Sequence, residues 1–214
     1  MNTIKAIFFD YDGVMTIDKT GTQSVCNYIS KNCLVDLKIF EKEYRKYNTD
    51  ILYGKTTHEK IWNELCSNIN KNIPISVLYD SFANTPIDAE MHSFARRIKE
   101  SKIKTGLITD NKADRMKMLT EKYKLREIFD IILISAEIGS GKESRKIFEM
   151  AISEAGCSPS ECIFIDNQEK NLVIPGKMGI NVIYYDDEKR DIEKLKTDIA
   201  EISSTGYSFL LPKS

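Results

Sequence analysis

Two aspartates, Asp10 and Asp12, follow directly on an apolar run near the start of the chain, in the stretch IFFDYDGVMT (residues 7–16). Two carboxylates held this close repel each other unless a cation or a shared proton compensates. A hard divalent ion such as Mg²⁺ would compensate, because it binds few carboxylates and keeps water and substrate phosphate oxygens as ligands. One carboxylate could then attack an electrophile while the other transfers a proton. The pair is also compatible with a solvated turn in which the acids cap backbone amides.

Further polar side chains follow two other apolar runs. Thr109, Asp110 and Asn111 come after IKTGLI (103–108), and Asp166 and Asn167 come after CIFI (162–165). Ligands of open α/β sheets bind at the carboxyl ends of the strands. Three separate strands are therefore expected to deliver oxygen-bearing side chains to one edge of a sheet.

The elements that would position these residues alternate along the chain. Short, continuously apolar runs are typical of parallel strands that are covered on both faces. Such runs separated by helix-period segments predict a doubly wound, Rossmann-like α/β fold with right-handed crossovers. The expected strands are 4–9, 103–108, 131–134, 162–165 and 180–185, and the expected helices are 88–101, 112–124, 142–155, 168–178 and 189–202.

The interval from residue 16 to 86 interrupts this alternation. It contains no convincing strand, and its segments 24–34, 36–47 and 58–69 place apolar residues at three- and four-residue spacings. The turn-like Asn84-Thr85-Pro86 marks its end. We therefore expect a core domain made of residues 1–15 and 87–214, with an inserted α-helical cap domain over residues 16–86. The last stretch, STGYSFLLPKS, could pack on the core or on a partner chain.

Composition narrows the class of protein. The 214 residues carry 31 Lys and Arg against 32 Asp and Glu, so no overall field recruits nucleic acid or an acidic membrane. No apolar segment approaches the roughly 18 residues of a membrane span, and no signal-peptide core precedes Asp10. We expect a cytoplasmic protein. The five cysteines form no CxxC pair, which favours buried thiols, and His58 and His92 are expected in packing or surface roles.

The stretch IFFDYDGVMT resembles the first motif of the haloacid dehalogenase superfamily, an apolar strand followed by Asp-x-Asp-Gly. LITDN resembles the second motif and GKESRKIFEMAI the third. CIFIDNQEKNLVIPGKMGI resembles the fourth, with Asn171 in the acidic loop and Gly179 before the last strand. An insertion after strand 1 is where this family carries its helical cap, and YGKTTHEKIWNELC resembles a cap stretch of sugar-phosphate phosphatases. The resemblance covers nearly the whole chain.

The resemblance implies a role for each residue. Asp10 would attack phosphorus and form an aspartyl-phosphate, and Asp12 would protonate the leaving oxygen and then activate water. Thr109, with Asp110, Asn111 and Lys142, would bind the phosphoryl group, and Lys142 would neutralise its growing negative charge. Mg²⁺ would be held by Asp10, Asp12, Asp166 and Asn167.

The chain departs from the family at two places. The family usually presents two acids, or Gly-Asp, where this chain has Asp166-Asn167, so either residue could be the direct metal ligand. Its third motif lacks the usual Lys-Pro step, because Glu143 follows Lys142. A phosphate-binding P-loop is disfavoured at this GSGK, since Gly-x4-Gly-Lys-[Ser/Thr] would need glycine at Ala136 and a hydroxyl at Glu143.

The sequence thus predicts a Mg²⁺-dependent phosphomonoester hydrolase. Members that cleave carbon–halogen bonds typically lack the second acid, so Asp12 favours phosphoryl transfer. The expected substrate is a small phosphorylated metabolite, such as a sugar phosphate, bound by a monomer or weak homo-oligomer without nucleic acid or membrane. A phosphomutase, or a catalytically weak phosphate-binding regulatory protein, stays as the alternative. Candidates for contacts with the leaving group are Arg45, Lys46, Lys55, Thr56 and His58.

Overall fold

The computed structural model describes residues 3–203. Its centre is a five-stranded, all-parallel sheet with the strand order β3-β2-β1-β4-β5. From β1 the chain adds β2 and β3 on one side of the sheet and then β4 and β5 on the other side. The boundary between β1 and β4 is therefore a topological switch point, the place where α/β proteins bind ligands. The strands are β1 (Ala6–Phe9), β2 (Lys104–Thr109), β3 (Ile131–Ile134), β4 (Cys162–Asp166) and β5 (Asn181–Tyr184). The doubly wound sheet predicted from the apolar runs is confirmed.

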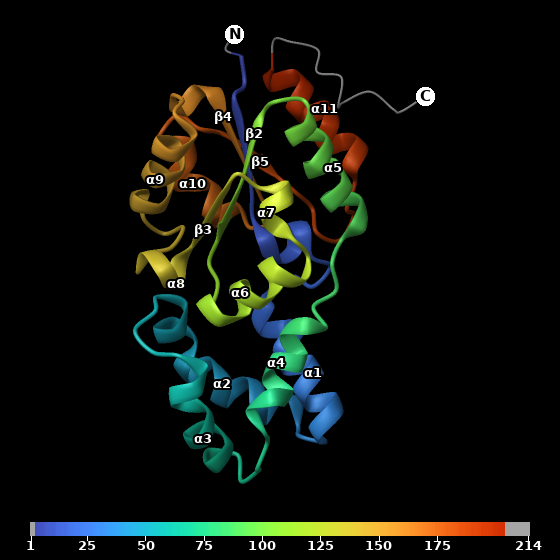
Figure 1. Ribbon diagram of the computed structural model, residues 1–214, viewed down its shortest axis with the longest axis vertical. Coiled ribbons are helices and arrows are strands. Elements are labelled where there is room, and N and C mark those ends of the chain that lie inside the picture. The colour runs from blue at the N-terminus through green and yellow to red at the C-terminus, as the bar shows by residue number, and fades with distance from the viewer. Residues whose placement is uncertain (1–2, 204–214) are drawn as a thin grey trace.

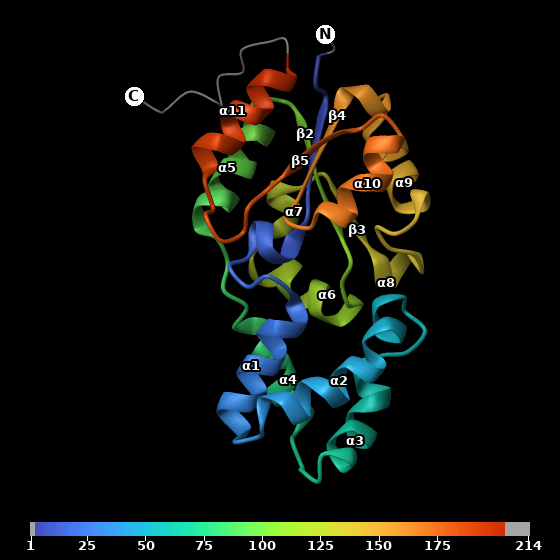
Figure 2. The ribbon, with the colours of Figure 1, turned by 180° about the vertical axis from the view of Figure 1, so that it is seen from behind.

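Helices cover both faces of this sheet (Figures 1 and 2). Alternate residues of β1 point to opposite faces, so Ile7 and Phe9 pack in one hydrophobic cluster and Ala6 and Phe8 in another. The first cluster includes side chains of α5 (Ala89–Glu100), α6 (Ala113–Lys122), α7 (Leu125–Ile128) and α11 (Ile192–Ile202). The second includes side chains of α9 (Arg145–Ala155) and α10 (Glu169–Lys177).

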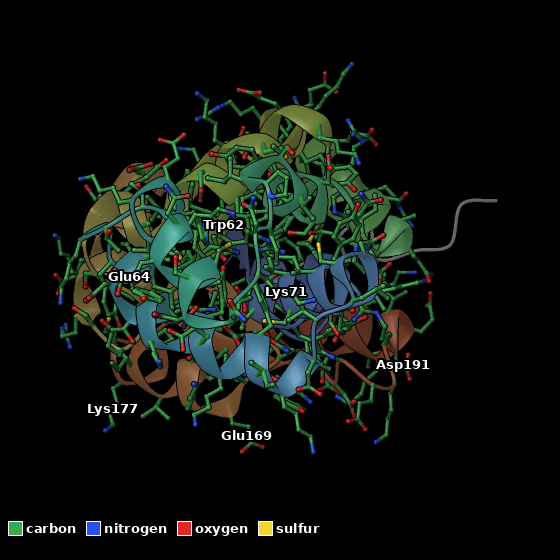
Figure 3. All side chains as sticks on the ribbon, turned by 90° about the horizontal axis from the view of Figure 1, so that it is seen from below. Trp62, Glu64, Lys71, Glu169, Lys177 and Asp191 are labelled. Carbon is green, nitrogen blue, oxygen red and sulfur yellow. The ribbon has the colours of Figure 1, made fainter. Side chains whose placement is uncertain are left out.

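The segment expected as a cap forms a separate group of helices at one end of the molecule (Figure 1). Its helices are α1 (Gly21–Cys33), α2 (Leu37–Leu52), α3 (His58–Asn68) and α4 (Ile75–Ala83), packed around their own hydrophobic cluster. Seen from that end, Trp62 lies among these helices, while the exposed Glu169, Lys177 and Asp191 lie at the rim (Figure 3). The two connecting segments meet in an antiparallel bridge between Thr16 and Ile87.

Short elements complete the fold around the sheet. They are a π-helical turn, η1 (Tyr11–Met15), a helix α8 (Ser135–Ile138) and a 3₁₀ turn, η2 (Pro159–Glu161). The predicted final stretch, residues 204–214, lies outside the described residues. No helix within residues 3–203 is long and apolar enough to cross a membrane.

Three of the five cysteines and both histidines are buried. Cys26, Cys66 and Cys162 are buried free thiols, as predicted, whereas Cys33 and Cys157 are only half-buried. No group of three or more His, Cys, Asp or Glu side chains among the described residues could hold a metal ion.

Candidate active site

The carboxyl ends of β1 and β2 open into a cavity of about 250 Å³ between the sheet and the helical group α1–α4. Asp10, Asp12, Thr109, Asp110 and Lys142 all line this cavity. The remaining predicted residues, Asn111, Asp166 and Asn167, are buried and are not among the residues that line it. The further lining residues are Lys19, Thr20, Gly21, Thr22, Arg45, Asn48, Leu52, Lys112, Gln168, Lys170 and Asn171.

Asp10 sits where β1 ends, and its backbone N–H continues the ladder by donating to the Ile165 carbonyl. Its Oδ1 accepts a hydrogen bond from the Tyr11 N–H at 2.7 Å, and its Oδ2 lies 2.9 Å from the Lys142 ammonium. Only 4% of the residue is exposed. Burial therefore raises the pKa of Asp10 well above its ordinary value, with Lys142 opposing the shift.

Lys142 connects Asp10 with Asp166 at the end of β4. Its ammonium donates to Asp166 Oδ2 at 2.6 Å, and its backbone N–H donates to Asp110 Oδ1 at 2.9 Å. Burial works against the charge of Lys142, but the three carboxylates outweigh it and raise the pKa above its ordinary value. The lysine lies in the turn before α9, which begins at Arg145 rather than at the predicted residue 142. It is therefore a fixed cation at neutral pH.

Asp12 has a partner that was not predicted, the guanidinium of Arg115 on α6. Nη1 donates to Asp12 Oδ2 and Nη2 to Oδ1, both at 2.8 Å, and the Asn111 amide also donates to Oδ2 at 2.8 Å. The Arg115 side chain is fully buried, so this is a bidentate pair shielded from water. Asn111 also accepts from the same guanidinium at 3.0 Å. Asn111 thus contacts the residues that hold Asp12.

Two turns explain why Asp12 reaches Arg115. The chain turns sharply after β1, with Gly13 at a φ of +86°, a conformation that L side chains rarely adopt. A Cβ at Gly13 would also collide with the Asn167 side chain. Across the cavity, Gly21 begins α1 so close to Arg115 that a Cβ there would lie 2.5 Å from Nη1. Both glycines permit close approaches that position the buried pair.

One side-chain oxygen at the end of β4 has no hydrogen-bond partner. Asp166 is occupied by several donors, since Lys142, Asn171 and the Gln168 N–H all donate to it. The Asn167 amide donates to Asp187 at 3.1 Å, but its own Oδ1 is buried with no hydrogen-bond partner. Buried polar atoms without partners are rare in folded proteins. A neutral amide oxygen is a ligand that Mg²⁺ accepts, and with the carboxylates of Asp10 and Asp166, which Lys142 links, it makes a donor set of two acids and one amide that fits this ion.

The predicted contacts from the helical segment separate into two groups. Arg45 lines the cavity, whereas Lys46, Lys55, Thr56 and His58 are not among its lining residues. His58 is fully buried and bridges two parts of the fold, with Nε2 2.7 Å from the Tyr44 hydroxyl and Nδ1 2.7 Å from Asp114 Oδ2. Its packing role agrees with the expectation for the two histidines.

Sequence reasoning missed Arg115 and Lys112. Each is a single basic residue beside or within an amphipathic helix, where most basic residues are solvated. The one signal was their position, because both follow LITDN within six residues and so start from the same sheet edge. Their burial depends on contacts with η1 and α1, which lie about a hundred residues earlier in the chain.

Known proteins resemble the chain over most of its length. Residues 4–172 match the family model of the haloacid dehalogenase-like hydrolases. A sesquiterpene phosphatase of Aspergillus oryzae is 24% identical over 83% of this chain and 88% of its own. A glyceraldehyde 3-phosphate phosphatase of Methanothermobacter thermautotrophicus is 21% identical over 89% of each chain. The mouse acyl-CoA dehydrogenase family member 10 is 24% identical over 90% of this chain, which spans only 19% of that protein.

Solved structures share the fold. A predicted hydrolase of the same family from Porphyromonas gingivalis has a TM-score of 0.69 at 18% identity and covers 93% of this chain and 99% of its own. A family enzyme from Bacteroides thetaiotaomicron, solved with magnesium, has a TM-score of 0.68 at 18% identity and covers 86% and 93%. The match of the family model to more than half of the residues, together with this fold, means that the chain belongs to the haloacid dehalogenase-like hydrolases.

Proposed function

We propose that this chain hydrolyses small phosphomonoesters, with Asp10 as the nucleophile. The observation that carries the proposal is the contact of Asp10 with Lys142 in the same cavity that Asp12 and Thr109 line. In-line phosphoryl transfer needs a positioned nucleophile and cations that neutralise the phosphoryl oxygens. Two phosphatases among the relatives support this reaction class.

In the proposed reaction, an Asp10 oxygen forms a bond to phosphorus as the bond from phosphorus to the ester oxygen breaks. Asp12, which must carry a proton when the substrate binds, gives that proton to the leaving alkoxide and becomes a carboxylate. It then takes a proton from the water that attacks the aspartyl-phosphate, so the enzyme returns to its starting state and phosphate leaves. Lys142 stabilises charge on the phosphoryl oxygens, and the Thr109 hydroxyl donates a hydrogen bond to them.

Asp10, Asp166 and Asn167 would hold Mg²⁺. Asp12 is neutralised by Arg115, whereas Asp10 and Asp166 share the single ammonium of Lys142, so negative charge remains at the ends of β1 and β4. When bound, Mg²⁺ would offset the charge of the phosphoryl oxygens. The unpartnered Asn167 Oδ1 supports Asn167 as a direct ligand, while Asp166 orients Lys142. The helices α1–α4 would act as the cap that limits substrate size and excludes water.

The test is hydrolysis of p-nitrophenyl phosphate with and without Mg²⁺. We expect turnover only with Mg²⁺ and a loss of roughly a thousandfold or more in Asp10→Asn, because an amide cannot act as this nucleophile. Asp50→Asn serves as a control, since it removes an exposed carboxylate that does not line the cavity. Turnover that is unchanged in Asp10→Asn, or absent from the wild type with every phosphomonoester, would contradict the proposal.

A further inference from the structure

One of the two buried cations of the cavity has no anionic partner among the described residues. Lys112 precedes α6, and only 4% of the residue is exposed although it lines the cavity. Its ammonium donates to Thr22 Oγ1 at 3.3 Å and lies 5.9 Å from the centre of the Tyr44 ring. Among residues 3–203, no Asp or Glu oxygen forms an ion pair with it within 4 Å. A buried charge normally has such a partner.

Three other cations that line the same cavity do have one, and the fourth, Lys170, is exposed. Lys142 is held by Asp10 and Asp166, Lys19 lies 3.3 Å from Asp187, and Arg45 pairs with Glu41. The positive charge of Arg115 acts on Lys112, and the carboxylates of Asp12 and Asp114 oppose it from beyond ion-pair distance. Lys112 is therefore a buried cation without an ion pair, and it lies in the cavity wall where the start of α6 contacts α1.

The surroundings of Lys112 penalise its charge. Burial, followed by the positive charge of Arg115, lowers the pKa of Lys112 to about 8. A buried ammonium without an ion pair costs folding free energy, and the lowered pKa indicates that the contacts with Thr22 and Tyr44 and the more distant carboxylates of Asp12 and Asp114 offset only part of that cost. An anion bound in the cavity would supply the missing interaction.

The wall around Lys112 has the composition of a ligand subsite. Thr22 is buried on α1 and donates through its hydroxyl to Asn48 Oδ1 of α2 at 3.2 Å, and both residues line the cavity. The Lys112 ammonium just before α6, the Thr22 hydroxyl on α1 and the Asn48 amide on α2 thus lie together on one side of the cavity. Lys142 and Thr109 lie on the sheet side, where the phosphoryl group of the proposed reaction would bind.

We propose that Lys112, with Thr22 and Asn48, binds a second anionic group of the substrate, so that the preferred substrates are small phosphomonoesters that also carry a carboxylate or a second phosphate. The inference rests on the proposed phosphatase function and narrows its substrate class. The cavity of about 250 Å³ admits only a compact molecule. Lys170 adds an exposed positive charge to the same cavity and favours such a polyanion.

The test compares substrates that differ in one group. In the carboxylate arm, 3-phosphoglycerate is compared with glycerol 3-phosphate, which has a hydroxymethyl group in place of the carboxylate. In the phosphate arm, glucose 1,6-bisphosphate is compared with glucose 6-phosphate. We expect kcat/KM to favour the more anionic member in at least one arm by about tenfold or more, as for a buried charge-assisted hydrogen bond. The arm with the larger ratio identifies the second group.

The variant Lys112→Gln should reduce that ratio by about tenfold or more, because it removes the charge that distinguishes the two substrates. Lys117→Gln is the matched control, since Lys117 is an exposed lysine of α6 that does not line the cavity, and its ratio should stay within about threefold of the wild type. Should Lys112→Gln fail to fold, Thr22→Val tests the same subsite and should lower the ratio in the same direction.

Equilibrium binding to the Asp10→Asn protein separates recognition from catalysis. The more anionic substrate should bind more tightly, and the additional Lys112→Gln change should abolish that difference. Efficient hydrolysis with equal kcat/KM values within both pairs would overturn the inference and leave the proposed function intact. Equal losses for both members of a pair in Lys112→Gln would also overturn it. Absence of hydrolysis of every phosphomonoester would contradict the proposed function itself.

Discussion

Asp12 is fixed at the edge of the cavity by three hydrogen bonds. Both of its oxygens accept from Arg115, and Asn111 adds a third bond. A carboxylate that transfers protons in both halves of the proposed reaction must keep its orientation throughout. We therefore assign Arg115 as a positioning residue that acts through Asp12.

Replacing Arg115 tests that assignment. Arg115→Met should lower kcat for alkyl phosphates by roughly ten- to a hundredfold and destabilise the fold by about 3–5 kcal/mol, because it leaves Asp12 buried without its partner. Arg115→Lys keeps the charge but not the fork of two parallel bonds, so we expect an intermediate loss. Arg126→Met, an exposed arginine on α7, is the control.

The diagnostic readout is the dependence on the leaving group. p-Nitrophenolate leaves without a proton, so the first chemical step should suffer less with p-nitrophenyl phosphate than with an alkyl phosphate in Arg115→Met. Single-turnover measurements isolate that step. An equal loss with both substrates would indicate that Arg115 is only structural.

Asn167 makes the metal site less charged than a pair of acids would. Asn167→Asp adds a carboxylate at the end of β4 and should lower the Mg²⁺ concentration for half-maximal activity about tenfold, since Mg²⁺ favours charged oxygen ligands. Gln168→Glu adds the same charge to the next residue, which lines the cavity, and should have a smaller effect. A similar shift in both variants would argue against direct ligation by Asn167.

Lys112 should cost stability as well as give specificity. Its pKa of about 8, below the ordinary 10.5, corresponds to about 3 kcal/mol of unfavourable burial at neutral pH. Because the folded pKa is the lower one, the penalty is complete below pH 8 and declines as pH rises toward 10.5. Lys112→Met should therefore increase the free energy of unfolding at pH 7, and the gain should shrink at pH 10. Urea unfolding measures both, and a decrease at pH 7 would contradict the account.

Among single residues, the sequence revealed those whose role is marked by the residues next to them in the chain. The paired acids after β1, Thr109 after β2 and Lys142 before α9 could be found because each stands in a short recognisable pattern. Arg115 and Lys112 could not, because their burial is created by η1, α1 and α2, which are remote in the sequence. Their types and spacing alone are indistinguishable from those of surface cations.

At the scale of elements, α6 joins the sheet to the helical group. Lys112 and Arg115 reach α1 and η1, and Asp114 accepts the hydrogen bond of His58 on α3. Burial would raise the pKa of Asp114, but the bond and charge of His58 lower it below the ordinary value. One short helix thus contacts both parts of the molecule through three different side chains.

Asp114→Asn should loosen this connection. We expect a loss of about 1–2 kcal/mol of stability at neutral pH, because the charge-assisted bond to buried His58 is lost. Since the folded pKa of Asp114 is lowered, its stabilisation is present above its ordinary pKa and disappears in acid as the carboxylate is protonated. In chemical denaturation the difference between variant and wild type should therefore shrink as pH falls below the ordinary pKa of an aspartate, and vanish in acid strong enough to protonate the folded carboxylate. A difference that persists there would contradict this assignment.

Elements were predicted well where the apolar period was long and undisturbed. All five strands and the five expected core helices lie within a few residues of their expected ranges, whereas α7 and α8 had no expected range of their own. Helix α4 was missed because it is short and follows Pro74 without a side-chain cap. The segment expected as one helix over 112–124 ends at Lys122, and α7 follows after Lys124 adopts a positive φ of 49°. Such backbone breaks at a lysine have no signal in the sequence.

For the whole molecule, contacts of α1–α4 with the core close the cavity. At one of them Gly54, after α2, lies against α8 so closely that a Cβ would come within 2.2 Å of the Ala136 carbonyl oxygen. Its φ of +67° is also unfavourable for any other residue. Ser135 donates to the Leu52 carbonyl at 2.8 Å beside it. These contacts of Gly54 and Leu52 with α8, called the seam below, fix the position of the helical group over Asp10.

Gly54→Ala should displace this seam. We expect a higher KM and a lower kcat together, because a cap that closes less well both binds the substrate and excludes water less effectively. Gly156→Ala is the matched control, since Gly156 also has a positive φ but nothing lies within 4 Å of its added Cβ. Unchanged kinetics in Gly54→Ala would mean that the seam does not position the cap.

The central claim is that Asp10 attacks phosphorus. Asp12→Asn should slow hydrolysis of the aspartyl-phosphate, so rapid quenching of this variant with p-nitrophenyl phosphate and Mg²⁺ should trap one phosphoryl group per chain. Peptide mass spectrometry should locate it on Asp10, and the double variant with Asp10→Asn should trap none. A phosphoryl group on another residue, or p-nitrophenolate release by Asp10→Asn at the wild-type rate, would contradict the account.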